Sequence, residues 1–148
     1  METNKTIIFQ VYYLGNCGCG FGREVSRKIE LKDTDTLEDL QRVIITQSFK
    51  WTDLHLYSFF MDNKPYSKNT KMEYTNNPYP DIFNSQKPNS ADTALKELAL
   101  KNNQKFLFVF DFGDDHQFGI KVEGFGEAEA GKEYPLILEE KGKAPRQY

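Results

Sequence analysis

Phenylalanine occupies every second position from 106 to 112, with other residues between. This period of two is typical of a β-strand whose two faces meet different surroundings. The alternation stops at Gly113–Asp115, residue types that favour turns, and apolar residues resume it at 118, 120 and 122. The pattern predicts an antiparallel hairpin whose four phenylalanines form one wall of the core.

Further patterns predict the elements around this hairpin. Residues 37–49 carry apolar side chains at helical spacing, and Thr36 with Asp39 forms a weak capping box before them. A second helical pattern covers residues 91–100. β-Branched and aromatic residues predict strands at 6–14, 24–31, 54–61 and 134–139, and a short edge strand at 71–75.

The order of these elements favours an α+β fold. We expect a β-grasp or roll-like mixed sheet of about five or six strands with two helices on one face. The 148 residues fit a single domain, 1–148. Residues 62–90 lack a sustained apolar period and predict one long loop, and residues 141–148 predict a polar tail.

The apolar runs and the charge of the chain exclude some classes of protein. No apolar run reaches the ~18–20 residues that cross a bilayer, and the N-terminal residues lack the order of a signal peptide, so we expect a soluble, cytoplasmic protein without a membrane partner. The net charge of -3 and the pI near 5.5 disfavour a nucleic-acid binder. Residues 63–105 are an exception, because they hold seven lysines against four acidic residues.

The two cysteines, Cys17 and Cys19, are separated by one glycine in the turn GNCGCGFG. A cytosolic protein keeps such thiols reduced, so we do not expect a structural disulfide. The turn lacks the Gly-Lys-Ser or Gly-Lys-Thr of a Walker loop and precedes a strand, which argues against nucleotide binding. His55 and His116 would complete a set of zinc ligand types, but the one-residue cysteine spacer is tighter than that of zinc sites.

Four stretches carry a family resemblance: residues 36–59, 93–100, 108–123 and 134–148, with the patterns Trp-x-Asp-x-His-Leu and Asp-Phe-Gly-Asp. Together they resemble the plasmid pRiA4b ORF-three-like family, also described as MM-3350-like proteins. The resemblance implies an α+β domain and a link to plasmids and mobile elements, whereas the family's biochemical function is unsettled. Family members commonly have tryptophan where His116 stands and histidine where Phe118 stands, which weakens for this chain any proposal that the family histidine binds a metal or moves a proton.

The hairpin tip gathers acidic side chains beside the predicted core wall. Carboxylates from one tight loop could hold a divalent cation, but aspartate and glycine are also common turn residues, and we favour the turn. His55 and Asp111 should project from the same, less buried face, about 5–10 Å apart, if the hairpin pairs beside strand 54–61. The candidate binding residues are Trp51, His55, Asp111, Asp114, Asp115 and His116.

These observations lead to three hypotheses of function. The sequence contains no complete catalytic constellation, so we favour a small non-enzymatic binding or accessory module with a protein partner and no cofactor. The alternative is a metal-dependent hydrolase or nuclease that uses the acidic hairpin loop and a divalent metal. The second alternative is nucleic-acid binding through residues 63–105. No catalytic residue is identifiable from the sequence.

Overall fold

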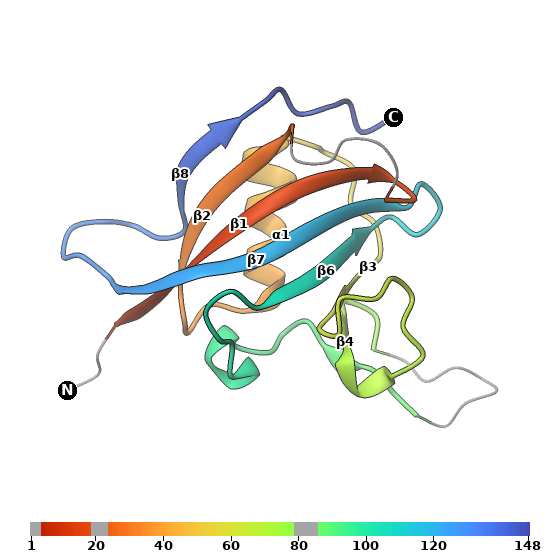
Figure 1. Ribbon diagram of the computed structural model, residues 1–148, viewed down its shortest axis with the longest axis horizontal. Coiled ribbons are helices and arrows are strands. Elements are labelled where there is room, and N and C mark those ends of the chain that lie inside the picture. The colour runs from red at the N-terminus through yellow and green to blue at the C-terminus, as the bar shows by residue number, and fades with distance from the viewer. Residues whose placement is uncertain (1–3, 19–23, 79–85) are drawn as a thin grey trace.

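A mixed sheet forms the body of the computed structural model, which describes residues 4–18, 24–78 and 86–148 (Figure 1). Within these residues the sheet has eight strands in the order β5-β4-β3-β6-β7-β1-β2-β8, and only the β4–β5 pair is parallel. The strands are β1 (Lys5–Asn16), β2 (Ser26–Lys32), β3 (Tyr57–Phe60), β4 (Glu73–Thr75), β5 (Asn89–Ser90), β6 (Lys105–Phe110), β7 (His116–Glu127) and β8 (Leu136–Lys141).

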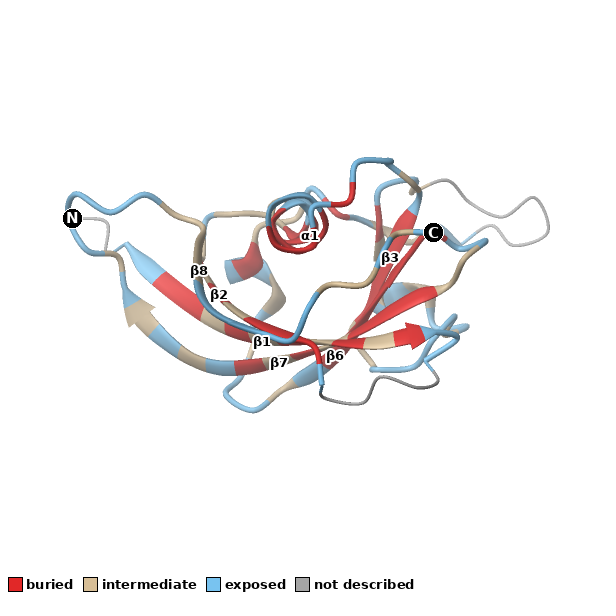
Figure 2. Ribbon diagram, turned by 90° about the horizontal axis from the view of Figure 1, so that it is seen from above, coloured by how far each residue is buried: buried red, intermediate tan, exposed pale blue. Residues whose placement is uncertain are grey.

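One helix crosses one face of this sheet (Figure 2). It begins as α1 (Leu37–Arg42) and continues as a π-helix over Val43–Ser48. Its apolar side chains bury themselves against the sheet face that carries the phenylalanine wall. The expected helix 37–49 is therefore confirmed, but the expectation of five or six strands with two helices is wrong, because eight strands and one helix are present among the described residues.

The capping box before α1 is formed as the sequence predicts. The Thr36 hydroxyl accepts a hydrogen bond from the Asp39 backbone N–H at 3.1 Å. The Asp39 carboxylate in turn accepts one from the Thr36 backbone N–H at 2.9 Å. Two N–H groups without a helical partner are thereby satisfied, which fixes the start of the helix.

Replacing Thr36 by alanine should lower the free energy of unfolding by about 1 kcal/mol, because the cap to Asp39 is lost. Urea denaturation measures the change. Thr34→Ala is the matched control, since Thr34 is exposed and should shift stability by less than about 0.5 kcal/mol. Equal losses in both variants would contradict a capping role for Thr36.

The central hairpin is confirmed, with one correction. Strands β6 and β7 pair antiparallel, and Phe106, Phe108 and Phe110 are buried in the core. Phe112 does not join them, because β6 ends at Phe110 and Asp111 takes a positive φ of 63° that breaks the alternation. The Phe112 side chain is consequently 38% exposed.

The second predicted helix, 91–100, is a single 3-10 turn over Leu95–Leu98. The backbone N–H groups of Leu95 and Lys96 donate to the carbonyl oxygens of Asp35 and Asp33, so this segment is held against the turn before α1. Ala99 then takes a left-handed conformation, which ends the turn. Contacts to a distant segment replace the helical hydrogen bonds here.

The strand predicted at 54–61 is shorter than expected. Strand β3 covers only Tyr57–Phe60 and pairs with β6, as predicted. Residues 51–56 before it are not part of a strand, and Leu54 and Leu56 are exposed. The expected strands 6–14, 24–31, 71–75 and 134–139 correspond to β1, β2, β4 and β8 with shifted ends.

The described helices give no candidate for a membrane span, since none combines sufficient length with sufficient apolar character.

Candidate functional site

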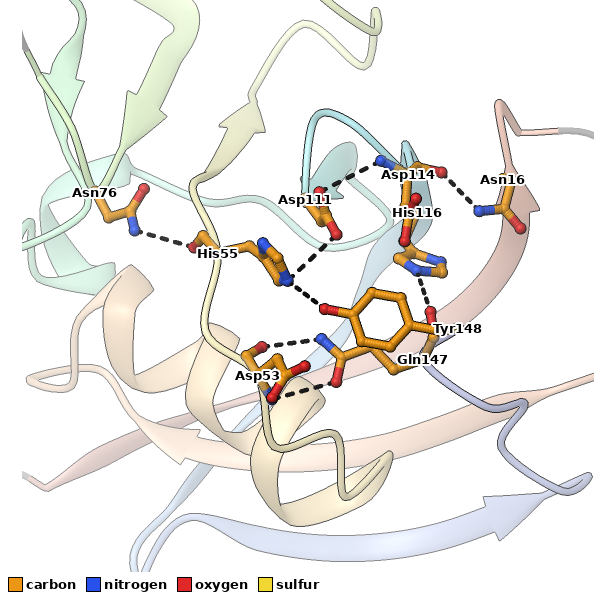
Figure 3. A network of polar contacts seen from close by, with 9 residues as sticks. All are labelled: Asn16, Asp53, His55, Asn76, Asp111, Asp114, His116, Gln147 and Tyr148. Atoms are coloured by element: carbon orange, nitrogen blue, oxygen red, sulfur yellow. Dashed lines mark hydrogen bonds and ion pairs between the residues drawn. The ribbon is translucent and has the colours of Figure 1, made fainter.

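Three segments distant in the sequence meet at one end of the sheet (Figure 3). They are residues 50–55 before β3, the β6–β7 turn from Asp111 to His116, and residues 143–148 after β8. All six sequence-predicted candidates lie in the first two segments. The third segment was predicted only as a polar tail.

Trp51 forms the apolar floor of this region. Its ring is 5% exposed and lies 4.5 Å, centroid to centroid, from the ring of His116. The indole N–H donates a hydrogen bond of 2.9 Å to the backbone carbonyl of Pro145. Buried tryptophan commonly finds such a partner for its one donor. Here the partner belongs to the 143–148 segment.

His116 links the core to the same segment. Its Nδ1 lies 2.8 Å from the Tyr13 hydroxyl, and its Nε2 lies 3.0 Å from the carbonyl oxygen of Gln147. A carbonyl only accepts, so Nε2 carries the proton and Nδ1 accepts from Tyr13. Burial lowers the pKa of His116, and burial also raises the pKa of Tyr13 to about 12, which keeps this neutral pair in place.

The side-chain amide of Gln147 forms two hydrogen bonds with the backbone of Asp53. Its amide nitrogen donates to the Asp53 carbonyl at 2.9 Å, and its amide oxygen accepts from the Asp53 N–H at 3.2 Å. A shorter or charged side chain could not make both bonds. This contact is selective for an amide of glutamine length.

His55 contacts both the β6–β7 turn and the 143–148 segment. Its Nε2 lies 2.7 Å from the Tyr148 hydroxyl and 3.4 Å from a carboxylate oxygen of Asp111. The expected proximity of His55 and Asp111 is confirmed. Desolvation first, and then the nearby Asp53 carboxylate, raise the pKa of Tyr148, so its hydroxyl is protonated at neutral pH and is no activated nucleophile.

The aspartates of the hairpin tip are used mainly within the turn. One Asp111 carboxylate oxygen accepts from the Asp114 N–H at 3.3 Å, and the Asp111 carbonyl accepts from the Asp115 N–H at 2.6 Å. The Asp115 carboxylate accepts from the Tyr66 hydroxyl at 2.6 Å. In the part of the chain that the structure describes, no three histidine, cysteine or acidic side chains are grouped to hold a metal ion.

Cys17 is disulfide-bonded, which corrects the expectation of a reduced thiol. Its backbone N–H donates to the Asp115 carbonyl at 2.9 Å, so the end of β1 is attached to the β6–β7 turn. Cys19 lies outside the described residues, as does the second half of the glycine-rich turn. A disulfide sulfur is a poor zinc ligand, because thiolate is the ligand form.

Asp53, Gln147 and Tyr148 belong to the site but were not among the sequence-predicted residues. Only the inclusion of 134–148 among the family-like stretches pointed to the last two. Beside their contacts, a cleft of about 420 Å³ opens between residues 49–53 and 144–148. The region therefore combines a bound segment with adjoining free space.

Comparison with known proteins supports the resemblance seen in the sequence. A family model described as plasmid pRiA4b ORF-3-like protein matches residues 20–147. No curated protein matches the chain. The solved structures include a similar one, the protein of unknown function MM3350 from Methanosarcina mazei Go1, with a TM-score of 0.73 and 20% identity over 99% of this chain and 74% of that chain. At 20% identity this structural match shows a shared fold and nothing more.

Proposed function

This chain belongs to the plasmid pRiA4b ORF-3-like protein family, and from that premise we propose that it is a non-enzymatic binding module for an extended peptide segment. The binding residues are Trp51, Asp53, His55 and His116, here called the Trp51 site. One observation carries the proposal: residues 145–148 make five hydrogen bonds to these four residues.

The contacts are those of peptide recognition. Two of them, from Trp51 and His116, reach backbone carbonyls, which every peptide offers. The other three select side chains, because Asp53 pairs with the glutamine amide and His55 with the tyrosine hydroxyl. The Trp51 site therefore suits a partner segment in which glutamine precedes tyrosine. In the proposal, residues 143–148 are a built-in occupant that a partner replaces.

Catalytic alternatives have less support. A metal-dependent hydrolase would need converging carboxylates, whereas the Asp111 carboxylate accepts a hydrogen bond from the Asp114 N–H and the Asp115 carboxylate accepts one from the Tyr66 hydroxyl. Nucleic-acid binding through residues 63–105 stays a prediction, tested by salt-sensitive retention on immobilised DNA.

The family description names a plasmid reading frame, so we extend the proposal to an accessory role on a plasmid or mobile element.

A variant that ends at Gly142 should bind a synthetic peptide of residues 143–148 in a saturable manner. Trp51 is the single tryptophan, so its fluorescence reports binding directly. Gln147→Ala in the peptide should weaken binding about tenfold, because two hydrogen bonds to Asp53 are lost. Arg146→Ala is the matched control and should change affinity less than about twofold, since Arg146 is exposed.

The fold of the shortened variant is checked by far-ultraviolet circular dichroism before the titration. Absence of binding by a folded variant would refute the peptide-binding proposal. So would equal affinities for the Gln147→Ala and Arg146→Ala peptides, because the contact to Asp53 would then select nothing.

A further inference from the structure

The sheet face opposite α1 contains a second, unrelated pocket. Figure 2 shows that the helix covers only one side of the sheet. On the other side a pocket of about 170 Å³ opens over β1, β6 and β7. Its lining includes Tyr12, Leu14, Asn63, Lys105, Gly119 and Lys121. None of these side chains belongs to the Trp51 site.

Two lysines face each other at this pocket. Lys105 of β6 and Lys121 of β7 are direct cross-strand partners. Like charges in such positions repel each other and destabilise the sheet. Neither lysine has an ion pair with another described residue. An anion between the two ammonium groups would relieve this repulsion.

Glycine gives the pocket its flat floor. Gly119 lies between Tyr12 of β1 and Leu107 of β6 in the sheet. A Cβ built at position 119 would lie 3.5 Å from Leu14 Cδ1, an ordinary contact distance, and would fill the floor. With glycine, the backbone is open to a flat group that also packs against the side chains of Tyr12 and Leu14.

We propose that this pocket binds a small molecule with one aromatic ring and one attached anionic group, such as an aryl phosphate or an aromatic carboxylate. The ring lies on Gly119 beside Tyr12, and the anion lies between Lys105 and Lys121. The volume of about 170 Å³ is below the ~300–1,000 Å³ of pockets for drug-sized ligands, which fits a single ring.

Phenyl phosphate is the probe, and calorimetry with ¹H–¹⁵N chemical-shift mapping of the intact protein is the measurement. We expect saturable binding that perturbs residues around Gly119 and leaves Trp51 fluorescence unchanged, because Trp51 packs on the opposite face. Inorganic phosphate and benzyl alcohol should each bind at least tenfold more weakly, since each has only one of the two groups.

Variants test the ring contact at Gly119 and the anion contact at Lys121 separately. Gly119→Ala should weaken phenyl phosphate at least tenfold without unfolding the protein, because the added Cβ meets only Leu14 at contact distance. Gly124→Ala is the matched control on the same strand and should leave affinity unchanged, since a Cβ there meets nothing within 4 Å. Lys121→Gln should weaken phenyl phosphate but not benzyl alcohol.

Unchanged affinity in Gly119→Ala would overturn the proposal, as would binding that moves Trp51 fluorescence. Oligothymidylate is a further probe, which tests whether this face binds single-stranded nucleic acid. Tight oligothymidylate binding with no binding of phenyl phosphate would assign the face to single-stranded nucleic acid and reject a small-molecule pocket. Failure of phenyl phosphate does not affect the Trp51 site, whose peptide titration is independent.

Discussion

Replacing Phe108 by alanine should lower the free energy of unfolding by about 3–5 kcal/mol and the melting temperature by roughly 10 °C. Phe108 is fully buried at the centre of β6. Its ring stacks on Phe59 at 4.5 Å and lies 5.3 Å from the ring of Phe118. The substitution leaves a cavity among side chains from three neighbouring strands, which cannot close without moving the sheet.

Phe112→Ala is the control for this prediction. The residue belongs to the same alternating run but lies beyond the strand, half exposed against Tyr66. Its loss should cost less than about 1 kcal/mol. Chemical denaturation followed by Trp51 fluorescence compares the two variants. A cost for Phe112→Ala as large as that for Phe108→Ala would mean that the run continues as a single buried face.

Phe112 also shows how far alternation alone can predict a fold. The period of two correctly indicated the hairpin and the buried face from Phe106 to Phe110. It failed at Asp111, where a positive φ reorients the chain. Aspartate tolerates this conformation but does not demand it as glycine nearly does, so the sequence carried no clear signal of the break.

One of the two helix predictions is confirmed and the other is wrong, for a similar physical reason. The helix from Leu37 was predictable because its cap is local, made between Thr36 and Asp39. The segment at 91–100 has helical spacing too, but its N–H groups at Leu95 and Lys96 bond to a turn some 60 residues earlier. Local spacing cannot reveal such a competing partner.

The candidate site was half predictable. His55 and Asp111 lie close together, as expected, with 3.4 Å between His55 Nε2 and an Asp111 carboxylate oxygen. The expected cause, strand parity, does not apply, because β3 begins only at Tyr57 and β6 ends at Phe110. The other half of the site comes from residues 145–148, where the Pro145 carbonyl meets Trp51 across 94 positions of sequence. No local pattern marks a polar tail as a bound segment, because its partners are backbone groups and rings set in place by the folded sheet.

His116 makes the stability of this protein depend on pH. Burial lowers its pKa below the ordinary value of about 6.5, although the nearby carboxylates of Asp114, Asp111 and Asp115 act in the opposite direction. The unfolded chain therefore binds a proton at His116 that the folded chain does not. Stability contributed by neutral His116 is fully present above about pH 6.5 and is lost as pH falls towards the lower, folded pKa.

The structural reason lies in the hydrogen bond from Tyr13. Neutral Nδ1 accepts from the Tyr13 hydroxyl, while Nε2 donates to the Gln147 carbonyl. Protonation makes both ring nitrogens donors, so the buried Tyr13 hydroxyl must turn from donor to acceptor. It also places a charge among the rings of Trp51 and Tyr13, away from water.

We therefore expect the free energy of unfolding of the wild-type protein to fall between pH 7 and pH 5, with a slope of at most about 1.4 kcal/mol per pH unit from this one group. His116→Gln retains an amide that can donate and accept but does not titrate. The wild-type minus variant difference in unfolding free energy should decrease over this range. A constant difference would contradict the assignment, and so would a nuclear magnetic resonance titration that gave His116 a pKa above 6.5.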